Sequence, residues 1–131
     1  MHLLNTYQSP IRWTDLDAYA HLNNAIYFDF MSEARATLLT EALAAGAVCQ
    51  FVVAHVECDY KAPYFYPDTV IVKQYCEEIG RSSFLLFYEF YSEKRPELLC
   101  AQAKARMVAY DPVAQKVVRL PENVLELLKG K

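Results

Sequence analysis

The chain has 131 residues, a length that suits one domain whose core needs neither disulfides nor a metal. Its formal net charge is −3, with both signs scattered along the sequence, which excludes the basic surface of a nucleic-acid-binding protein. Hydrophobic residues make up 54% of the chain and include ten tyrosines and seven phenylalanines. This composition excludes a disordered protein, and in a small domain it suggests that another subunit covers part of the apolar surface.

The cysteines and the N-terminus indicate the compartment in which the protein works. No two cysteines have the C-x-x-C spacing of a zinc or redox site, so free thiols in a reducing compartment are expected at Cys49, Cys58, Cys76 and Cys100. The first residues lack the charged and then apolar pattern of a secretion signal. No apolar run approaches the roughly 20 residues that cross a bilayer. We therefore expect a cytoplasmic protein with no membrane partner.

A strand and then a long helix are predicted for the first third of the chain. Residues 7–14 are rich in bulky side chains, which favour a strand, and end in a polar cluster. Residues 24–45 have a helical pattern, which Asn23 or Asn24 can cap at its start and Gly46 can end in the left-handed conformation. Residues 25–31 are apolar on most sides, so we expect protein to surround this helix.

Beyond Gly46 the pattern changes to that of strands. Four strands and a short closing helix are predicted, the strands at residues 51–60, 69–78, 84–92 and 98–110 and the helix at residues 121–128. In the last strand, alternate residues from Ala101 to Ala109 are small or apolar, which lets a helix approach the sheet closely. Short connections indicate antiparallel neighbours. One helix on an antiparallel sheet is an α+β architecture, here in a single domain of residues 1–131.

Side chains suited to catalysis are concentrated between the first strand and the long helix. This loop contains two carboxylates, a histidine and two amides, namely Asp15, Asp17, His21, Asn23 and Asn24. Asp17 precedes a helix N-terminus, where free amide N–H groups favour negative charge. Such a field stabilises a carboxylate or a developing oxyanion. The chain has no G-x-S-x-G motif, which argues against a serine hydrolase of the α/β type.

The loop contains a distinctive run of residues that continues into the helix. It reads Arg12-Trp13-x-Asp15-x-Asp17-x-x-x-His21-x-Asn23-Asn24-x-x-Tyr27, followed by Glu33-Ala34-Arg35. This run resembles the hotdog-fold acyl-CoA thioesterases, in particular the 4-hydroxybenzoyl-CoA thioesterase-like family. Weaker matches follow in the expected order at Asp59-Tyr60-x-x-Pro63, Gly80-Arg81-Ser82-Ser83-Phe84 and Ala105-Arg106-Met107-Val108. The resemblance implies a five- to six-stranded antiparallel sheet wrapped around a long central helix. It also implies a homodimer or homotetramer with the active site at the dimer interface.

The same resemblance implies a role for each polar residue. The carboxylate at the position of Asp17 is catalytic, as a nucleophile or as a general base on a water, and a backbone N–H at a helix start polarises the thioester carbonyl. The remaining implied roles are support of Asp17 by Asp15, His21, Asn23 and Asn24; the amide donor at Gln50 or Phe51; coenzyme A contacts by Lys61, Arg81, Ser82 and Ser83; and an acyl pocket lined by Tyr27, Phe28 and Tyr60. Coenzyme A belongs to the small-molecule substrate, and no other cofactor is expected.

Other interpretations of these residues stay open. Asp17 and Asn23 suit helix capping, while Asp15 suits a loop-orienting role through its hydrogen bonds. His21 suits local hydrogen bonding as well as substrate contact, and the turn after Gly80 suits an ordinary polar hairpin. No metal site is expected, because the chain has only three histidines. The alternative functions are an enoyl-thioester hydratase or dehydratase of the same fold, whose Asn-Pro element is absent here, and a non-catalytic acyl-thioester-binding protein.

Overall fold

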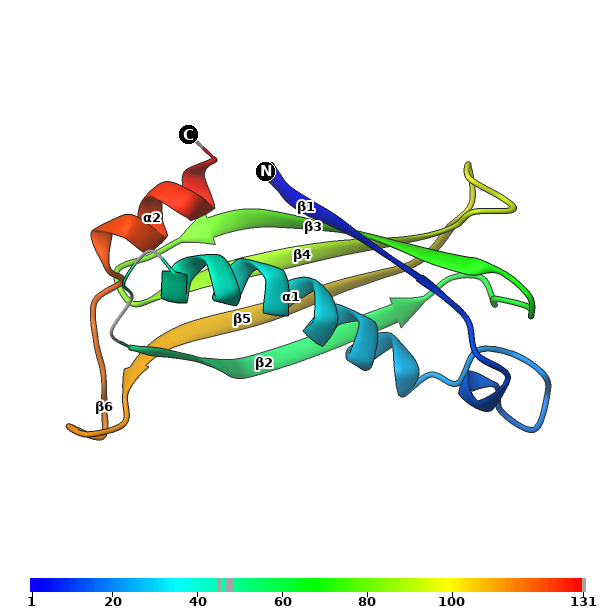
Figure 1. Ribbon diagram of the computed structural model, residues 1–131, viewed down its shortest axis with the longest axis horizontal. Helices are drawn as coiled ribbons and strands as arrows, with labels where there is room; N and C mark the ends of the chain where they lie inside the picture. The colour runs from blue at the N-terminus through cyan, green and yellow to red at the C-terminus, as the bar shows by residue number, and fades with distance from the viewer. Residues whose placement is uncertain (45, 47–48, 131) are drawn as a thin grey trace.

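The computed structural model describes residues 1–44, 46 and 49–130, which form one antiparallel sheet with two helices (Figure 1). The elements in chain order are β1 (His2–Pro10), a 3-10 turn (Trp13–Asp15), α1 (Ile26–Ala44), β2 (Gln50–Tyr60), β3 (Thr69–Ile79), β4 (Ser83–Ser92), β5 (Leu99–Asp111), β6 (Lys116–Val117) and α2 (Glu122–Lys129). The predicted antiparallel sheet and α+β class are confirmed. Within the described residues, no helix is both long and apolar enough to cross a membrane.

The order of the strands in the sheet is β1-β3-β4-β5-β2, with β6 paired to the end of β5. β2 and β3 are consecutive in the chain, but β2 pairs with β5 whereas β3 pairs with β1 and β4. The expectation that short connections join neighbouring strands is therefore wrong for this pair, because residues 61–68 carry the chain across the sheet. β2 lies at one edge of the sheet and is exposed along most of its length.

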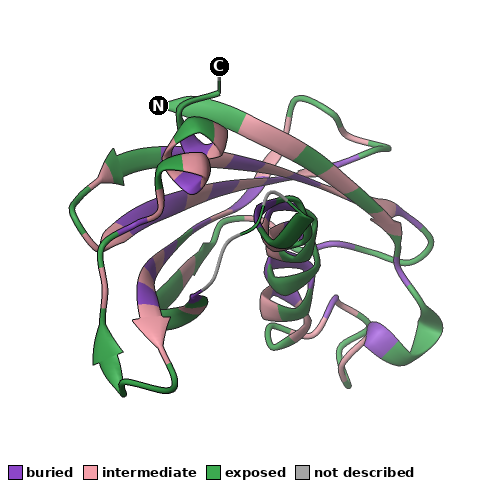
Figure 2. Ribbon diagram, turned by 60° about the vertical axis from the view of Figure 1, so that its left-hand side comes forward, coloured by how far each residue is buried: buried purple, intermediate pink, exposed green. Residues whose placement is uncertain are grey.

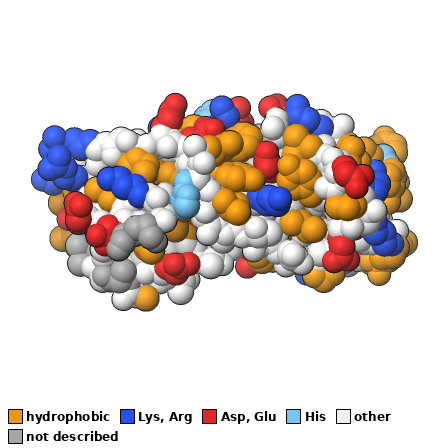
Figure 3. All heavy atoms as spheres, turned by 90° about the horizontal axis from the view of Figure 1, so that it is seen from above, with side chains coloured by type: hydrophobic (Ala, Val, Ile, Leu, Met, Phe, Trp, Pro, Cys, Tyr) orange, Lys and Arg blue, Asp and Glu red, His pale blue; other side chains and the backbone are white. Residues whose placement is uncertain are grey.

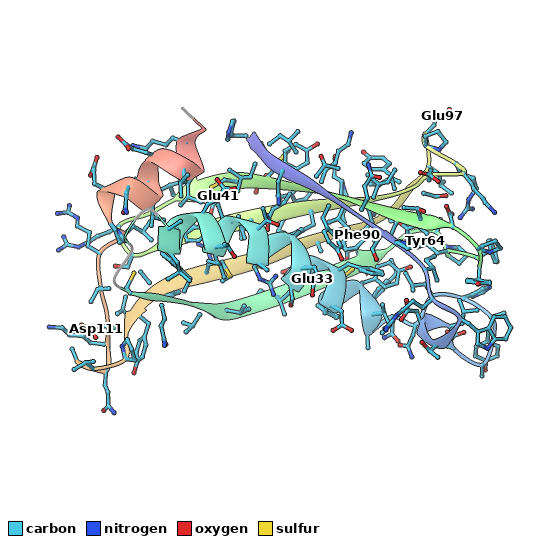
Figure 4. All side chains as sticks on the ribbon, in the orientation of Figure 1. Glu33, Glu41, Tyr64, Phe90, Glu97 and Asp111 are labelled. Atoms are coloured by element: carbon cyan, nitrogen blue, oxygen red, sulfur yellow. The ribbon has the colours of Figure 1, made fainter. Side chains whose placement is uncertain are left out.

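α1 packs one face against the sheet and leaves the other face open (Figure 2). The buried residues recur at helical spacing and are Tyr27, Phe30, Met31, Ala34, Leu38 and Ala42. Exposed carboxylates, among them Glu33 and Glu41, lie between them along the helix (Figure 4). The expectation that protein surrounds this helix is therefore wrong within one chain. The apolar run at residues 25–31 overstated its burial, because Phe28 is only half-buried and Asp29 is exposed.

A buried hydrogen-bond network fixes α1 on the sheet. The fully buried side chain of Gln74, on β3, donates to the carbonyl oxygen of Ala34 in α1 at 3.1 Å and to Asn5 Oδ1 at 2.8 Å. Its Oε1 accepts a hydrogen bond from the Tyr88 hydroxyl at 2.7 Å, and Arg35 of α1 donates to the same hydroxyl oxygen at 3.3 Å. These partners compensate the cost of burying the Gln74 amide. Because two of the hydrogen bonds join the sheet to α1, the network also sets the position of the helix along the sheet.

The predicted alternation in β5 is confirmed, and its inward residues belong to the core that also contains the buried face of α1. The buried members are Ala101, Ala103, Ala105, Met107 and Ala109, whereas Gln102, Lys104 and Arg106 between them are half-buried or exposed. Four of the five inward side chains are alanines, so this strand adds little bulk to the space between sheet and helix. Larger side chains from β3, β4 and α1 fill that space as one core.

Two predicted boundaries at the start of the chain differ from the structure. A strand was predicted at residues 7–14, but β1 begins five residues earlier and ends before Arg12, where the chain turns because the Asp15 carboxylate accepts the Arg12 backbone N–H. α1 starts two residues later than predicted. Its predicted last residue, Ala45, lies outside the described residues, but Gly46 has a φ of +91°, as expected after a helix end. β6, only two residues long, was not predicted.

Replacing Ala105 by Leu should lower the free energy of unfolding by about 1–3 kcal/mol, because a larger side chain must enter a closely packed core. Urea denaturation followed by circular dichroism measures this change. Lys104→Leu places the same side chain on the outward face of the same strand and should shift the free energy by no more than about 0.5 kcal/mol. Equal destabilisation by the two substitutions would contradict the assignment of faces.

Candidate active site

The loop after β1 is built on a buried carboxylate. Asp15 is only 2% exposed and accepts hydrogen bonds from the Arg12 backbone N–H at 2.9 Å and from the Arg12 guanidinium at 2.9 and 3.2 Å. This carboxylate raises the pKa of Arg12 through hydrogen bonding and charge attraction. Because the charge of Asp15 is paired and hydrogen-bonded, its burial is compensated. These are the contacts of a residue that orients the loop, and Asp15 lines a second cleft that does not include Asp17.

Asp17 lies in a tight turn that fixes one of its two carboxylate oxygens. Oδ1 accepts hydrogen bonds from the backbone N–H groups of Tyr19 at 2.9 Å and His21 at 3.2 Å. The Asp17 N–H in turn donates to the His21 carbonyl oxygen at 2.8 Å. Ala20 closes the turn with a φ of +62°, in the left-handed region. Among the described residues no donor is found for Oδ2 of Asp17, so the carboxylate is oriented through one oxygen alone.

Asp17 opens onto a cleft of about 460 Å³, which we call the Asp17 cleft. Its lining comes from the loop, the first turn of α1 and the end of β2 with the segment that follows, and consists of Asp17, His21, Leu22, Asn24, Tyr27, Tyr60, Lys61, Ala62 and Pro63. The Leu22 N–H donates to the Tyr64 carbonyl oxygen at 3.2 Å, and His21 pairs with Phe65 in a short antiparallel bridge. These backbone contacts hold the loop against the segment after β2. Six residues predicted from the sequence therefore share one cleft.

The inner wall of the cleft is aromatic. The buried ring of Tyr27 contacts Tyr60 edge to face at 4.8 Å between centroids. On the core side it contacts Phe90 at 5.4 Å and Tyr64 at 6.0 Å, and Figure 4 shows these two residues at the same end of the sheet. Burial raises the pKa of Tyr27, and the nearby charge of Asp17 adds to the effect. A weakly hydrated wall of this kind suits the apolar part of a ligand whose reacting group lies beside Asp17.

Exposed aromatic side chains lie on the loop that carries Asp17 and on the segment after β2. Hydrophobic side chains gather at this end of the molecule (Figure 3), where Trp13 is 71% exposed and packs edge to face on Tyr66 at 5.7 Å. The His21 ring packs in the same way on Phe65 at 5.2 Å, and the Arg95 guanidinium lies 5.5 Å from the centre of that ring. His21 is therefore oriented by ring packing, while its backbone holds the Asp17 carboxylate.

The start of α1 forms one wall of the Asp17 cleft. Asn23 Oδ1 accepts the Ala25 N–H at 2.9 Å, which is a capping contact, and the Asn23 carbonyl oxygen accepts the Ile26 N–H at 3.0 Å. Within the part of the chain that the structure describes, no acceptor is found for the N–H of Asn24 or of Tyr27. Both residues line the cleft. Unpaired amides at a helix N-terminus attract negative charge.

Several residues predicted for the site lie outside the Asp17 cleft in the folded chain. Gln50 and Phe51 begin β2, not a helix, and line an apolar hollow beside Leu39 and Leu43. Tyr60 lies at the other end of this 11-residue strand, roughly 33 Å away at the usual rise per residue. The predicted coenzyme A contacts Arg81, Ser82 and Ser83 follow β3 at the end of the sheet opposite the Asp17 loop. Phe28 is half-buried against the core and is not part of the cleft.

The cleft also contains residues that the sequence did not single out for the site. Leu22 lies between two predicted residues, and Ala62 and Pro63 follow Tyr60 and Lys61. Pro63 belonged to the weaker Asp59-Tyr60-x-x-Pro63 match, which was the available signal. Apolar and small residues have no chemical signature of their own, so only the folded arrangement identifies them. Among the described residues, no three His, Cys, Asp or Glu side chains are grouped closely enough to hold a metal ion.

Comparisons with known proteins agree on one family. The model of the thioesterase-like superfamily matches residues 11–128 of this chain. A long-chain acyl-CoA thioesterase of Escherichia coli (strain K12) is 27% identical over 127 residues, which cover 93% of this chain and 95% of that protein. A solved structure from Pseudomonas aeruginosa is 30% identical, with a TM-score of 0.85 and coverage of 94% of this chain and 96% of that one.

The fold extends to more distant relatives. The structure of a 1,4-dihydroxy-2-naphthoyl-CoA thioesterase from Synechocystis superposes with a TM-score of 0.82 over 95% of each chain, although only 18% of the residues are identical. At this level of identity the likeness concerns the fold alone. The β1 to α2 arrangement is thus retained when most side chains differ.

Replacing Asp15 by Ala should lower the free energy of unfolding by about 2–3 kcal/mol, because hydrogen bonds to a buried charged group are among the strongest in a protein. The measurement is a urea denaturation curve. Glu93→Ala, in the exposed turn after β4, is the matched control and should lie within about 0.5 kcal/mol of the wild type. A stability of Asp15→Ala equal to that of the control would show that the loop does not depend on this carboxylate.

Proposed function

This chain belongs to the thioesterase-like superfamily, and we propose that within it the protein is an acyl-CoA thioesterase whose catalytic carboxylate is Asp17. Its membership makes it a thioester hydrolase. The observation that supports the rest of the proposal is the Asp17 cleft. There a carboxylate held through one oxygen shares a cleft with Asn24 and Tyr27, whose backbone N–H groups have no acceptor among the described residues. The products are a free acid and coenzyme A.

The proposed chemistry needs only one oriented carboxylate, because a thioester carbonyl is reactive and its thiolate leaves readily. As a general base, Asp17 takes a proton from a water molecule while the water oxygen attacks the carbonyl carbon. The carbon–sulfur bond then breaks, and Asp17 returns the proton to the departing thiolate. As a nucleophile, the available oxygen of Asp17 attacks the carbonyl carbon itself. A mixed anhydride forms, the thiolate leaves, and water then hydrolyses the anhydride.

The carbonyl oxygen of the thioester gains negative charge in either route. In this proposal the N-terminus of α1 stabilises that charge. The amides of Asn24 and Tyr27 are unpaired among the described residues. Removing one such donor typically slows an enzyme by about 10²–10³-fold. We therefore assign the carbonyl-polarising N–H to this turn in place of the amide of Gln50 or Phe51.

The acyl group and coenzyme A would occupy different parts of the site. In this proposal the acyl group lies against Tyr27 and Tyr60, and Lys61, exposed at the mouth, attracts the anionic coenzyme A. His21 supports the carboxylate through its backbone. Arg81, Ser82 and Ser83 are too far along the sheet to reach this cleft from within one chain, so any contact with coenzyme A would come from another subunit.

The exposed edge of β2 supports an assembly of two copies. Val52, Val53 and Val56 are 37–45% exposed on this strand, and its outer edge has no neighbouring strand among the described residues. Antiparallel pairing of β2 with its copy about His55 would set Gln50 of the second copy opposite Tyr60. We propose a homodimer of this kind, or a homotetramer built from it, with each Asp17 cleft at the dimer interface.

An assay of released thiol with a panel of short-chain, long-chain and aromatic acyl-CoAs tests the reaction. Free coenzyme A is expected from at least one member of the panel. Loss of enoyl absorbance without thiol release would instead support a hydratase. Binding of acyl-CoA without either change would support a non-catalytic binding protein.

Asp17→Asn should lower kcat for the best substrate by at least about 10²-fold, because the amide can neither accept the proton nor attack the carbonyl. Thiol release under saturating substrate gives kcat, and circular dichroism verifies the fold. Asp29→Asn makes the same change at an exposed carboxylate outside the Asp17 cleft and should retain wild-type turnover. Wild-type turnover in a folded Asp17→Asn protein would exclude Asp17 as the catalytic carboxylate.

Light scattering at micromolar concentration should give the mass of a dimer or tetramer. Val53→Lys should reduce that mass towards the monomer and lower thiol release, because a charge on the edge of β2 opposes pairing. Val113→Lys, at a residue 93% exposed and outside β2, should leave both properties unchanged. A monomeric mass for the active wild-type protein would disprove the proposed assembly.

A further inference from the structure

We propose that Tyr60 is a positioning residue, which holds the first turn of α1 in the orientation that presents a free amide N–H to the thioester carbonyl. This inference rests on the proposed function, because it concerns the group that polarises the carbonyl in that reaction. Tyr60 is the last residue of β2 and lines the Asp17 cleft. Its hydroxyl donates a hydrogen bond to the Asn24 carbonyl oxygen at 2.9 Å, between residues 36 positions apart.

The Asn24 carbonyl depends on this partner because the helix does not supply one. In a regular α-helix the N–H four residues later, that of Phe28, would donate to it. Here the Phe28 N–H donates to the Ala25 carbonyl oxygen at 3.2 Å. Among the described residues, the Tyr60 hydroxyl is the one donor found for the Asn24 carbonyl.

The same peptide unit is fixed at its other end. The Ala25 N–H donates to Asn23 Oδ1 at 2.9 Å, and the Asn23 N–H donates to the Asp15 carbonyl oxygen at 2.9 Å. The peptide plane between Asn24 and Ala25 is therefore held at both its carbonyl and its N–H. The Asn24 N–H belongs to the preceding peptide unit, whose Asn23 carbonyl oxygen accepts the Ile26 N–H at 3.0 Å. The two held peptide units together restrain the directions of the Asn24 and Tyr27 N–H groups.

The surroundings of Tyr60 keep its hydroxyl in place as a donor. The Tyr27 ring contacts the Tyr60 ring edge to face at 4.8 Å, so the ring position does not depend on the hydroxyl alone. Burial and the neighbouring Cys58 raise the pKa of Tyr60, so the phenol stays protonated near neutral pH. A substitution that removes only the hydroxyl can therefore separate the hydrogen bond from the packing.

Tyr60→Phe removes the hydrogen bond and keeps the ring. Thiol release from a short-chain, a long-chain and an aromatic acyl-CoA gives kcat and KM for each substrate that the wild type hydrolyses. We expect kcat to fall about 10–100-fold, less than or similar to the loss of a whole oxyanion donor, with KM changed by no more than about twofold. The loss should be equal for all substrates, because the thioester carbonyl is common to them.

Tyr75→Phe is the matched control, since Tyr75 on β3 also donates one hydrogen bond of 2.9 Å, to Glu89, and lies outside the Asp17 cleft. It should retain wild-type kcat and match Tyr60→Phe in unfolding midpoint and in mass by light scattering. A wild-type kcat in Tyr60→Phe would overturn the inference. A loss that differs between acyl groups would overturn it too, because it would indicate that the hydroxyl acts on the acyl group and not on the helix start. A reduced mass would do the same, because it would indicate an assembly role.

The two proposals fail in different ways. If the wild-type protein releases no thiol from any member of the panel, the proposed function itself is wrong. If the wild type is active and Asp17→Asn is not, while Tyr60→Phe behaves like Tyr75→Phe, only the positioning role of Tyr60 is wrong.

Discussion

Contact between one face of α1 and the sheet is the constraint on which the rest of the structure depends. The alanines of β5 belong to the same core as the buried face of the helix, and the Gln74 network sets its position along the sheet. Because α1 begins beside the end of β2, fixing the helix also fixes the place where the loop, the helix start and β2 meet. The Asp17 cleft is formed at that junction.

Asp15 and Asp17 lie two residues apart in the loop, but their carboxylates have opposite surroundings. Asp15 is buried and fully engaged by Arg12, so it acts on the backbone of the loop. Asp17 is half-buried, and backbone amides hold only one of its oxygens. A buried, paired charge is expensive to disturb, whereas a partly exposed one is available to a ligand. The loop therefore combines a rigid base with a chemically accessible side chain.

The sequence predicted what depends on local pattern and missed what depends on the path of the chain. The β5 alternation and Gly46 after the helix are local signals, and both agree with the structure. Crossing of the sheet between β2 and β3 leaves no such signal, so their pairing was mispredicted. The resemblance located the loop around Asp17, but it could not show that Gln50 and Arg81 lie a strand length away, nor that Tyr60 reaches the Asn24 carbonyl.

The edge of β2 that has no neighbouring strand among the described residues has a consequence for how the protein behaves beside other chains. Backbone donors and acceptors on a strand edge recognise almost any extended partner, so such an edge can pair with foreign chains or start aggregation. The strand is not purely apolar, because the side chains of His55 and Glu57 form a hydrogen bond of 3.0 Å near its middle. Polar side chains at these two positions favour a partner strand that places polar side chains opposite them. These two exposed side chains therefore oppose the pairing of β2 with a purely apolar extended segment of another chain.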